Sequence, residues 1–303
     1  MKLFVLGNGF DLHHNLPTTT SDFTNCIDKY DYPEYYMNSG VDWNLYEEGL
    51  SYFDVDTMSE LHIEGPDYLS DRESDRDGVI LQMKQKMVEM LDIRDNALKE
   101  MINIANQKIH EISHQVKSSD AFYNSLVLSF NYTSTLEQLY SLENIKDVLY
   151  IHGFFYDDDD LIFGYSEPNE DVLKKFYPHD VDGNNNFTSN DFYEEEHDDY
   201  YIQNQYQLMY DYYCSNQKTH QIEKLNNWLK SYEGEVEEII VLGHSMGLVD
   251  KPYFELLEEI LNPARWRISR YKNSPSDEDI QNYSFYSKVD HSYCNISSFV
   301  SLL

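Results

Sequence analysis

The sequence has few basic residues, few cysteines and no long apolar run. Lysine and arginine number 22 against 55 aspartates and glutamates, which gives a formal net charge of −33. This charge repels phosphate backbones, so we expect no direct binding to nucleic acid. A basic protein partner or a bound cation suits the charge better, although the acidity also serves solubility alone.

The cysteines and histidines show no spacing that is typical of a metal centre. Cys26, Cys214 and Cys294 lie far apart and form no C-x-x-C pair, so neither a disulfide framework nor a thiolate zinc site is expected. The adjacent His13 and His14, and the acidic string EEEHDD, match no recognised ligand set. We therefore expect no metal and no tightly bound cofactor.

Apolar runs are short throughout the chain. The first extends only from Leu3 to Leu6, which is too short for a signal peptide. No later run approaches the about 18 residues that a membrane-spanning helix needs. Hydrophobic residues still make up 41% of the chain, enough for a core. We expect a soluble, cytoplasmic protein without a membrane partner, and association of the chain with its own copies stays open.

Strand-like and helix-like segments alternate along the chain. Apolar runs that end in polar or glycine turns predict strands at residues 3–6, 126–130, 147–153, 161–166, 237–243 and 265–271. Apolar spacing predicts one long helix or a helical pair over 79–117, and helices leading to about Tyr232 and over 251–262. Another helix begins after Ser134, which forms a capping-box spacing with Glu137. The alternation predicts an α/β fold with a mainly parallel, Rossmann-like sheet flanked by helices.

Two stretches interrupt this alternation. Residues 21–74 are irregular in pattern, and residues 167–201 are polar and acidic, with few aliphatic side chains. We interpret residues 1–303 as one α/β domain that carries an acidic, mostly helical or irregular cap. The cap regions are inserted at about 40–118 and 165–232.

Polar turns follow several of the predicted strands. They are Gly7–Asp11, Phe130–Thr133, His152–Gly153 and Gly243–Ser245. The carboxyl ends of parallel strands meet at one edge of a sheet, and α/β proteins bind their ligands there. We therefore expect these turns to converge on one site.

The first turn, GNGFD, suits a phosphate group. Gly7 and Gly9 permit unusual backbone angles, so that N–H groups face an anion at a helix start. The motif is only G-x-G, however, and Pro17 argues against a regular helix from residue 10 onward, so a tight structural turn explains the glycines equally well. Asn131 either holds a ribose hydroxyl or a water, or caps the following helix.

His152 is the candidate general base, since histidine exchanges its proton near neutral pH. The other interpretation is a packed histidine at a strand end without a catalytic role. Asp11, His244 and Asp250 have the same two interpretations, as groups of the site or as structural polar residues.

Gly243 to Gly247, GHSMG, has the G-x-S-x-G spelling of the nucleophile elbow of α/β-hydrolases. The acid and histidine of such a triad follow the serine in the chain, and His291 is the single histidine after it. The residues behind the motif, LVDKPYFELL, also lack the small side chains that pack there in hydrolases. We interpret the match as coincidental and keep a Ser245–Asp277–His291 triad as a lesser alternative.

Several blocks, in order over most of the chain, resemble the bacteriophage abortive-infection AbiH-like family. They are LFVLGNGFDLHHNLPTTTSDF, WNLYEE from Trp43, SFNYTSTLEQLY, YIHG with LIFGYS, and VLGHSMGLVDKPYF. The opening block is the most specific. In that family GHS followed by aspartate is itself one of the typical blocks. The resemblance therefore explains the G-x-S-x-G spelling without implying a serine hydrolase.

The resemblance implies antiviral defence by a toxin that arrests or kills the infected cell. The family is in turn remotely similar to sirtuin-like, nucleotide-binding Rossmann-type proteins. That similarity implies phosphate at Gly7 and Gly9, a ribose beside Asn131, and His152 as the base. Asn8, Thr133 and the pair Phe10-Asp11 depart from the sirtuin-like pattern, and no cysteine cluster supplies the zinc module of deacetylating sirtuins.

We therefore expect an effector that binds a nucleotide and hydrolyses NAD at the nicotinamide–ribose bond. Asn131 and His152 would place the water, and Asp11 would steady the developing positive charge. The other candidate ligand-binding residues are Gly7, Asn8, Gly9, Phe10, Thr133, Gly243, His244, Ser245 and Asp250. The alternatives are a non-catalytic sensor of a nucleotide or phage component that acts through a protein partner, and the serine hydrolase.

Overall fold

The computed structural model describes most of the chain. The described residues are 1–30, 46–63, 73–113, 120–140, 142–155, 161–165, 167–176, 200–218, 221–271, 274–292 and 294–300. The centre of the predicted acidic insertion (177–199) and the tryptophan of the WNLYEE block lie outside these residues. The chain divides into two compact units: the first comprises Met1–Cys26, Ala97–Ser166 and Lys218–Leu303, and the second comprises Ile27–Asn96 and Glu167–Gln217.

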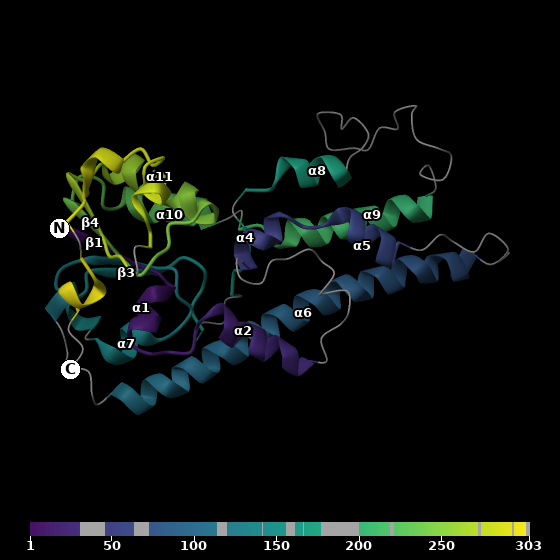
Figure 1. Ribbon diagram of the computed structural model, residues 1–303, viewed down its shortest axis with the longest axis horizontal. Coiled ribbons are helices and arrows are strands. Elements are labelled where there is room, and N and C mark those ends of the chain that lie inside the picture. The colour runs from purple at the N-terminus through teal and green to yellow at the C-terminus, as the bar shows by residue number, and fades with distance from the viewer. Residues whose placement is uncertain are drawn as a thin grey trace. The chain divides into compact units, whose positions relative to one another are not determined.

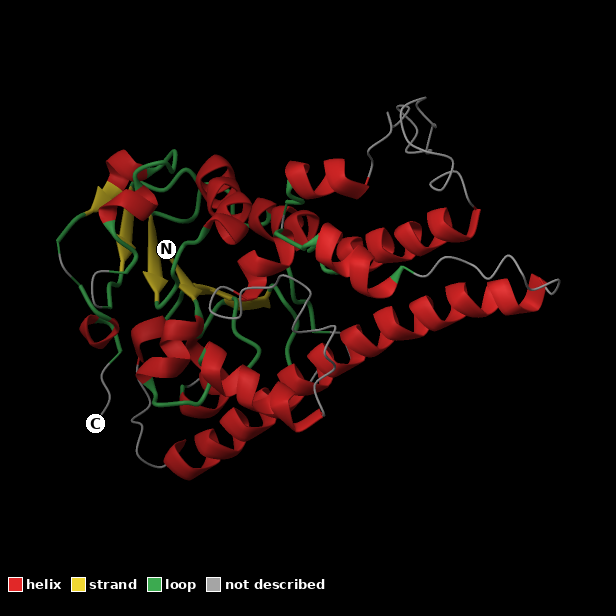
Figure 2. Ribbon diagram, turned by 45° about the vertical axis from the view of Figure 1, so that its right-hand side comes forward, coloured by secondary structure: helices red, strands yellow, loops and turns green. Residues whose placement is uncertain are grey.

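A parallel sheet forms the centre of the first unit (Figures 1 and 2). Its strands are β1 (Lys2–Leu6), β2 (Leu126–Ser129), β3 (Asp147–Tyr150), β4 (Glu238–Leu242), β5 (Arg265–Ile268) and β6 (Val289–Asp290). They lie in the order β3-β2-β1-β4-β5-β6, and every neighbouring pair is parallel. The predicted parallel, Rossmann-like α/β fold is confirmed.

Helices cover both faces of the sheet, because the central strands are apolar on both faces. The helices are α1 (Asn8–His13), α2 (Thr20–Ile27), α4 (Tyr46–Ser51), α5 (Val55–His62), α6 (Glu73–Ile112), α7 (Thr135–Leu139), α8 (Glu170–Phe176), α9 (Tyr200–Ser215), α10 (Gln221–Lys230), α11 (Lys251–Leu261) and α12 (Asp277–Ile280). Figure 1 shows α10 and α11 on one side of β1 and β4, and α1 and α7 on the other. Helix α6 contributes to both units, which divide it between Asn96 and Ala97.

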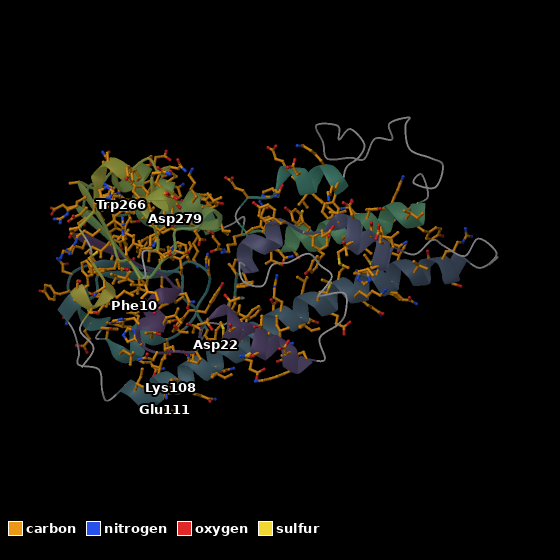
Figure 3. The ribbon with its side chains drawn as sticks, viewed as in Figure 1. Phe10, Asp22, Lys108, Glu111, Trp266 and Asp279 are labelled. Carbon is orange, nitrogen blue, oxygen red and sulfur yellow. The ribbon has the colours of Figure 1, made fainter. Side chains whose placement is uncertain are left out.

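Two apolar cores result from the alternation of side chains along each strand. On β1, Leu3 and Val5 pack with α10 and α11, whereas Phe4 and Leu6 pack with α1 and α7. In the first core the Trp266 ring stacks on Phe285, with ring centroids 3.8 Å apart. Figure 3 labels Trp266 in this core and Phe10 in the other.

The second unit has an aromatic core of its own. The rings of Phe53 and Phe176 stack with centroids 6.0 Å apart. The Tyr213 hydroxyl donates to the Ser51 carbonyl (3.1 Å) and accepts from the Asn169 N–H (2.9 Å). Aromatic side chains thus pack α4, α8 and α9 together in this unit.

The long helix predicted over 79–117 is confirmed as the single helix α6, which begins at Glu73. One strand prediction was wrong, and one strand was missed. Residues 161–165 form an extended segment without a strand, in which the Ile162 N–H donates to the His152 carbonyl (2.9 Å). β6 has two residues and was not predicted.

Two other local predictions were also wrong. Residues 21–74 are not irregular throughout, since α2, α4 and α5 lie there. Ser134 precedes α7 as predicted, but the capping box with Glu137 does not form. The Ser134 hydroxyl instead donates to Asn106 Oδ1 (2.9 Å), and Glu137 accepts from the Tyr150 hydroxyl. Among the described helices, none is both long and apolar enough to cross a membrane.

Candidate functional site

The polar turns lie where the strand order of the sheet reverses. From β1 the chain continues outward to β2 and β3, whereas from β4 it continues in the opposite direction to β5 and β6. β1 and β4 are neighbours in register, with Leu6 beside Leu242. Ligands of open α/β sheets bind outside the carboxyl ends of the strands at such a reversal. The turns after β1 and β4 therefore occupy the expected position of a site.

Glycine lets these two turns approach backbone to backbone. The Gly9 N–H donates to the Gly243 carbonyl (2.7 Å), and the Gly7 N–H donates to the Leu242 carbonyl (3.0 Å). A Cβ at Gly243 would lie 2.3 Å from the Phe10 nitrogen, and the φ of Gly243 is +71°. Close packing therefore explains the glycines, and their predicted phosphate contact stays a prediction.

Asp11, in α1, is buried and bonded to the turn after β2. Its Oδ2 accepts from the Thr133 hydroxyl (2.7 Å) and its Oδ1 from the Thr135 hydroxyl (2.6 Å). Burial raises the pKa of Asp11 to about 6, although hydrogen bonds from Thr135, Thr133 and Asn131 lower it in part. The carboxylate joins the first two turns and is ionised at neutral pH.

Asn131 makes a second connection between these turns. Its Nδ2 donates to the Gly7 carbonyl (3.1 Å). Asn8 is exposed, and its Nδ2 donates to the Thr18 carbonyl (2.8 Å). The Phe10 ring packs in the core, so a ligand-binding role for Phe10 depends on its backbone.

A second group of polar side chains is buried beyond the ends of β2, β3 and β4. Asp250 Oδ2 lies 3.4 Å from His244 Nε2, and Asp250 Oδ1 lies 3.7 Å from Lys218 Nζ. The Met246 N–H donates to His244 Nδ1 (2.9 Å), so the proton of a neutral His244 ring is on Nε2 and faces Asp250. Burial would raise the pKa of Asp250, but Lys218 and His244 hold it below its ordinary value.

His152 follows β3 and belongs to the same buried group. Burial and the charge of Lys218 hold its pKa well below the ordinary value, so its ring is neutral at physiological pH. A hydrogen bond joins the ring to the Phe130 carbonyl. This bond involves Nδ1, because Nε2 is buried and has no hydrogen-bond partner among the described residues. His152 Nε2 therefore presents a lone pair.

Comparison with protein families identifies the relatives of this chain. A model of the bacteriophage abortive infection AbiH family matches residues 3–270. The chain belongs to the AbiH family. Comparison with curated proteins gave no match, and comparison with solved structures gave none. The match covers the sheet through β5 and every residue of the two polar groups, so the family resemblance predicted from the sequence is confirmed.

The tertiary structure of this AbiH-family chain sorts the predicted site residues into two groups. Asp11 is bonded to Asn131 and Thr133 beside the first turn. His152, His244 and Asp250 form the buried group around Lys218, which we call the charge cluster. The predicted roles of these residues in binding and catalysis stay predictions.

Lys218 was not predicted. It is a lone lysine between α9 and α10, far in sequence from each of its neighbours, and no local pattern distinguishes it. Thr135 was also missed, although its position two residues after Thr133 was a usable signal.

Ser245 is exposed beside the charge cluster. Its hydroxyl makes no hydrogen bond to any residue that the structure describes, whereas Asp277 Oδ1 lies 3.1 Å from His291 Nδ1. Positive φ angles occur on both sides of the serine, at Gly243 and Met246. An acid–histidine pair of the AbiH-family chain thus exists without a bond to the serine, and the hydrolase stays a lesser alternative.

Proposed function

We propose that the chain acts in phage abortive infection as an effector that binds a nucleotide at the carboxyl edge of its sheet and hydrolyses it. NAD, cut at the nicotinamide–ribose bond, is the first substrate to test. The observation that supports the proposal is the lone pair of His152 Nε2, which is buried without a hydrogen-bond partner among the described residues.

The absence of a hydrogen-bond donor at the buried His152 Nε2, among the residues that the structure describes, is unfavourable and therefore calls for an explanation. Leaving such a group without a hydrogen bond costs about 1–3 kcal/mol. In the charge cluster this cost falls on a neutral histidine, whose Nε2 can accept a hydrogen bond and then a proton from a bound donor. A substrate hydroxyl or an attacking water would supply the missing donor.

The reaction assigns a task to each group. Water attacks C1′ of the ribose while the C1′–nitrogen bond breaks, and the electron pair of that bond leaves with the nicotinamide and neutralises its ring. His152 Nε2 takes the proton of the water, Asn131 positions the water or a ribose hydroxyl, and ionised Asp11 lowers the energy of the positive charge on the sugar. The products are nicotinamide, ADP-ribose and a proton.

The test follows products by mass-resolved chromatography after incubation of the purified chain with NAD, ATP or GTP. We expect nicotinamide release by wild type and none by His152→Ala. The matched control is His14→Ala, which removes another buried histidine, one whose two ring nitrogens bond to the Phe10 carbonyl and the Tyr140 hydroxyl. Nicotinamide release by folded His152→Ala would rule out the catalytic role.

A second function is favoured by a different observation. The N–H groups of Gly7 and Gly9 already donate to carbonyls of the chain, and Asp250 is paired with Lys218. Polar groups that are already bonded within the chain are less available for catalysis. This favours a sensor that binds a nucleotide or a phage component and acts through a protein partner. Calorimetric binding of a nucleotide that stays intact through long incubation would favour this sensor over the enzyme.

A further inference from the structure

Lys218 is the lysine around which the charge cluster forms. Its side chain is fully buried (0% exposed), and its backbone N–H donates to the Tyr165 carbonyl (2.8 Å). A buried ammonium group costs several kcal/mol unless a negative charge offsets it. Asp250 supplies that charge from the residue that precedes α11, and the side chain of Asp250 is only 12% exposed. The fold therefore keeps an ion pair out of water beside His152.

The pair acts on His152 from two directions. The positive charge of Lys218 opposes protonation of the imidazole, whereas the negative charge of Asp250 favours it. His244 also faces His152 from the turn after β4. Among the described residues, two tyrosines also lie near the imidazole: the ring centroids of Tyr132 and Tyr253 are 6.1 Å and 5.9 Å from that of His152.

We propose that Lys218 is a positioning residue for His152: its ammonium group, held 3.7 Å from Asp250 in the charge cluster, adds to the effect of burial and opposes protonation of the imidazole, so that Nε2 stays an acceptor. The inference rests on the proposed function in one respect, the role of His152 as the base. It also defines the chemistry of the ligand group at this point. A neutral Nε2 can only accept, so it binds a hydroxyl or a water, each of which donates a hydrogen bond. An ionised phosphate ester has no proton to donate, so any phosphate lies elsewhere along the edge.

The experiment is an NMR titration of the histidine ring protons in the full chain, with the His152 signal assigned from its loss in His152→Ala. In Lys218→Met the positive charge is gone, and we expect the pKa of His152 to rise by about one unit or more. In Asp250→Asn the negative charge is gone, and we expect the pKa to fall. Opposite shifts from two adjacent substitutions indicate electrostatics, because loosened packing would move both in the same direction.

Lys224→Met is the matched control. Lys224 is exposed and its Nζ donates to the Tyr150 carbonyl (3.3 Å), next to the chain that leads to His152. We expect its His152 titration to coincide with that of the wild type. An unchanged titration in folded Lys218→Met, or shifts of the same sign in Lys218→Met and Asp250→Asn, would overturn the inference.

Each single variant leaves one buried charge without its counter-charge, Asp250 in Lys218→Met and Lys218 in Asp250→Asn, and is therefore prone to unfold. The double variant Lys218→Met/Asp250→Asn removes both charges and retains the volume. Compared with the wild type, it should raise the pKa of His152, because Lys218 acts on the imidazole more strongly than Asp250 does, and the absence of any rise would again overturn the inference.

The titration needs no turnover, so the inference and the proposed function fail separately. Opposite shifts in a chain that leaves NAD intact would keep the positioning role and refute the hydrolase. If the chain does hydrolyse NAD, the low-pH limb of its rate profile should move to higher pH in Lys218→Met and stay in place in Lys224→Met.

Discussion

The buried carboxyl of Asp11 predicts how stability depends on pH. The pKa of this group is 3.8 in the unfolded reference and about 6 in the folded chain. Between these values the folded state holds a proton that the unfolded state has lost. The contribution of Asp11 to the free energy of unfolding is therefore greatest below pH 3.8 and is lost as the pH rises through 6. The difference of about 2.2 pH units corresponds to about 3 kcal/mol.

Asp11→Asn removes this titration while keeping the shape of the side chain. Relative to wild type, the variant should gain stability as the pH rises, by about 3 kcal/mol over the whole window and about 1.3 kcal/mol between pH 5 and pH 7. The substitution also changes the hydrogen bonds to Thr133 and Thr135, and this changes the free energy of unfolding by an amount that does not depend on pH. The comparison uses only the slope of the free energy of unfolding against pH, so this constant change cancels. The assay is urea unfolding at several pH values, followed by tryptophan fluorescence and extrapolated linearly to water.

Asp22→Asn is the control. Asp22, labelled in Figure 3, accepts from the backbone N–H and the hydroxyl of Thr19, but it is partly exposed. The substitution therefore removes a threonine-bonded carboxylate without the burial. Stability curves of wild type and Asp11→Asn that run parallel from pH 5 to pH 7 would refute the reasoning that burial controls this carboxyl.

Two further predictions concern the turn after β4. Gly243→Ala should cost about 3 kcal/mol or more, because its Cβ meets backbone atoms of Gly9 and Phe10, whereas Gly234→Ala, at a similar φ of +75° in open space, should cost about 1 kcal/mol. Urea midpoints measure both, and equal losses would contradict the close-packing argument. Ser245→Ala should retain growth arrest in infected cells, and a fluorophosphonate should leave the wild type unlabelled. Labelling at Ser245 would instead support the hydrolase.

The sequence predicted the central strands and the long helix because their signals are local. β1, β2 and β4 are apolar runs bounded by polar turns, and α6 repeats apolar residues at helical spacing. The prediction of a strand from an apolar run was wrong at residues 161–165. This run forms a segment whose Ile162 N–H donates to the His152 carbonyl and to no strand of the sheet. β6 was missed because a strand of two residues is too short to show an alternation of apolar and polar side chains.

The site was predicted in part for the same reason. Parallel strands bring their carboxyl ends together, so the turns at Gly7, Asn131, His152 and His244 could be placed on one edge from their positions in the chain. The predicted capping box at Ser134 does not form, because the Ser134 hydroxyl donates its hydrogen bond to Asn106 in helix α6, which is distant in the sequence. Contacts of this kind leave no trace in local spacing.

By itself the sequence determined the alternation of strands and helices, the family to which the chain belongs, and which residues end the strands. Only the tertiary structure decided that Gly243 presses against the first turn, that Asp11 lies buried among threonines, and that Lys218 faces Asp250 beside His152. The physical reason is the distance along the chain over which each interaction acts. Periodicity and turn chemistry act between residues a few positions apart, whereas burial and charge pairing depend on which distant segments the packed sheet brings into contact.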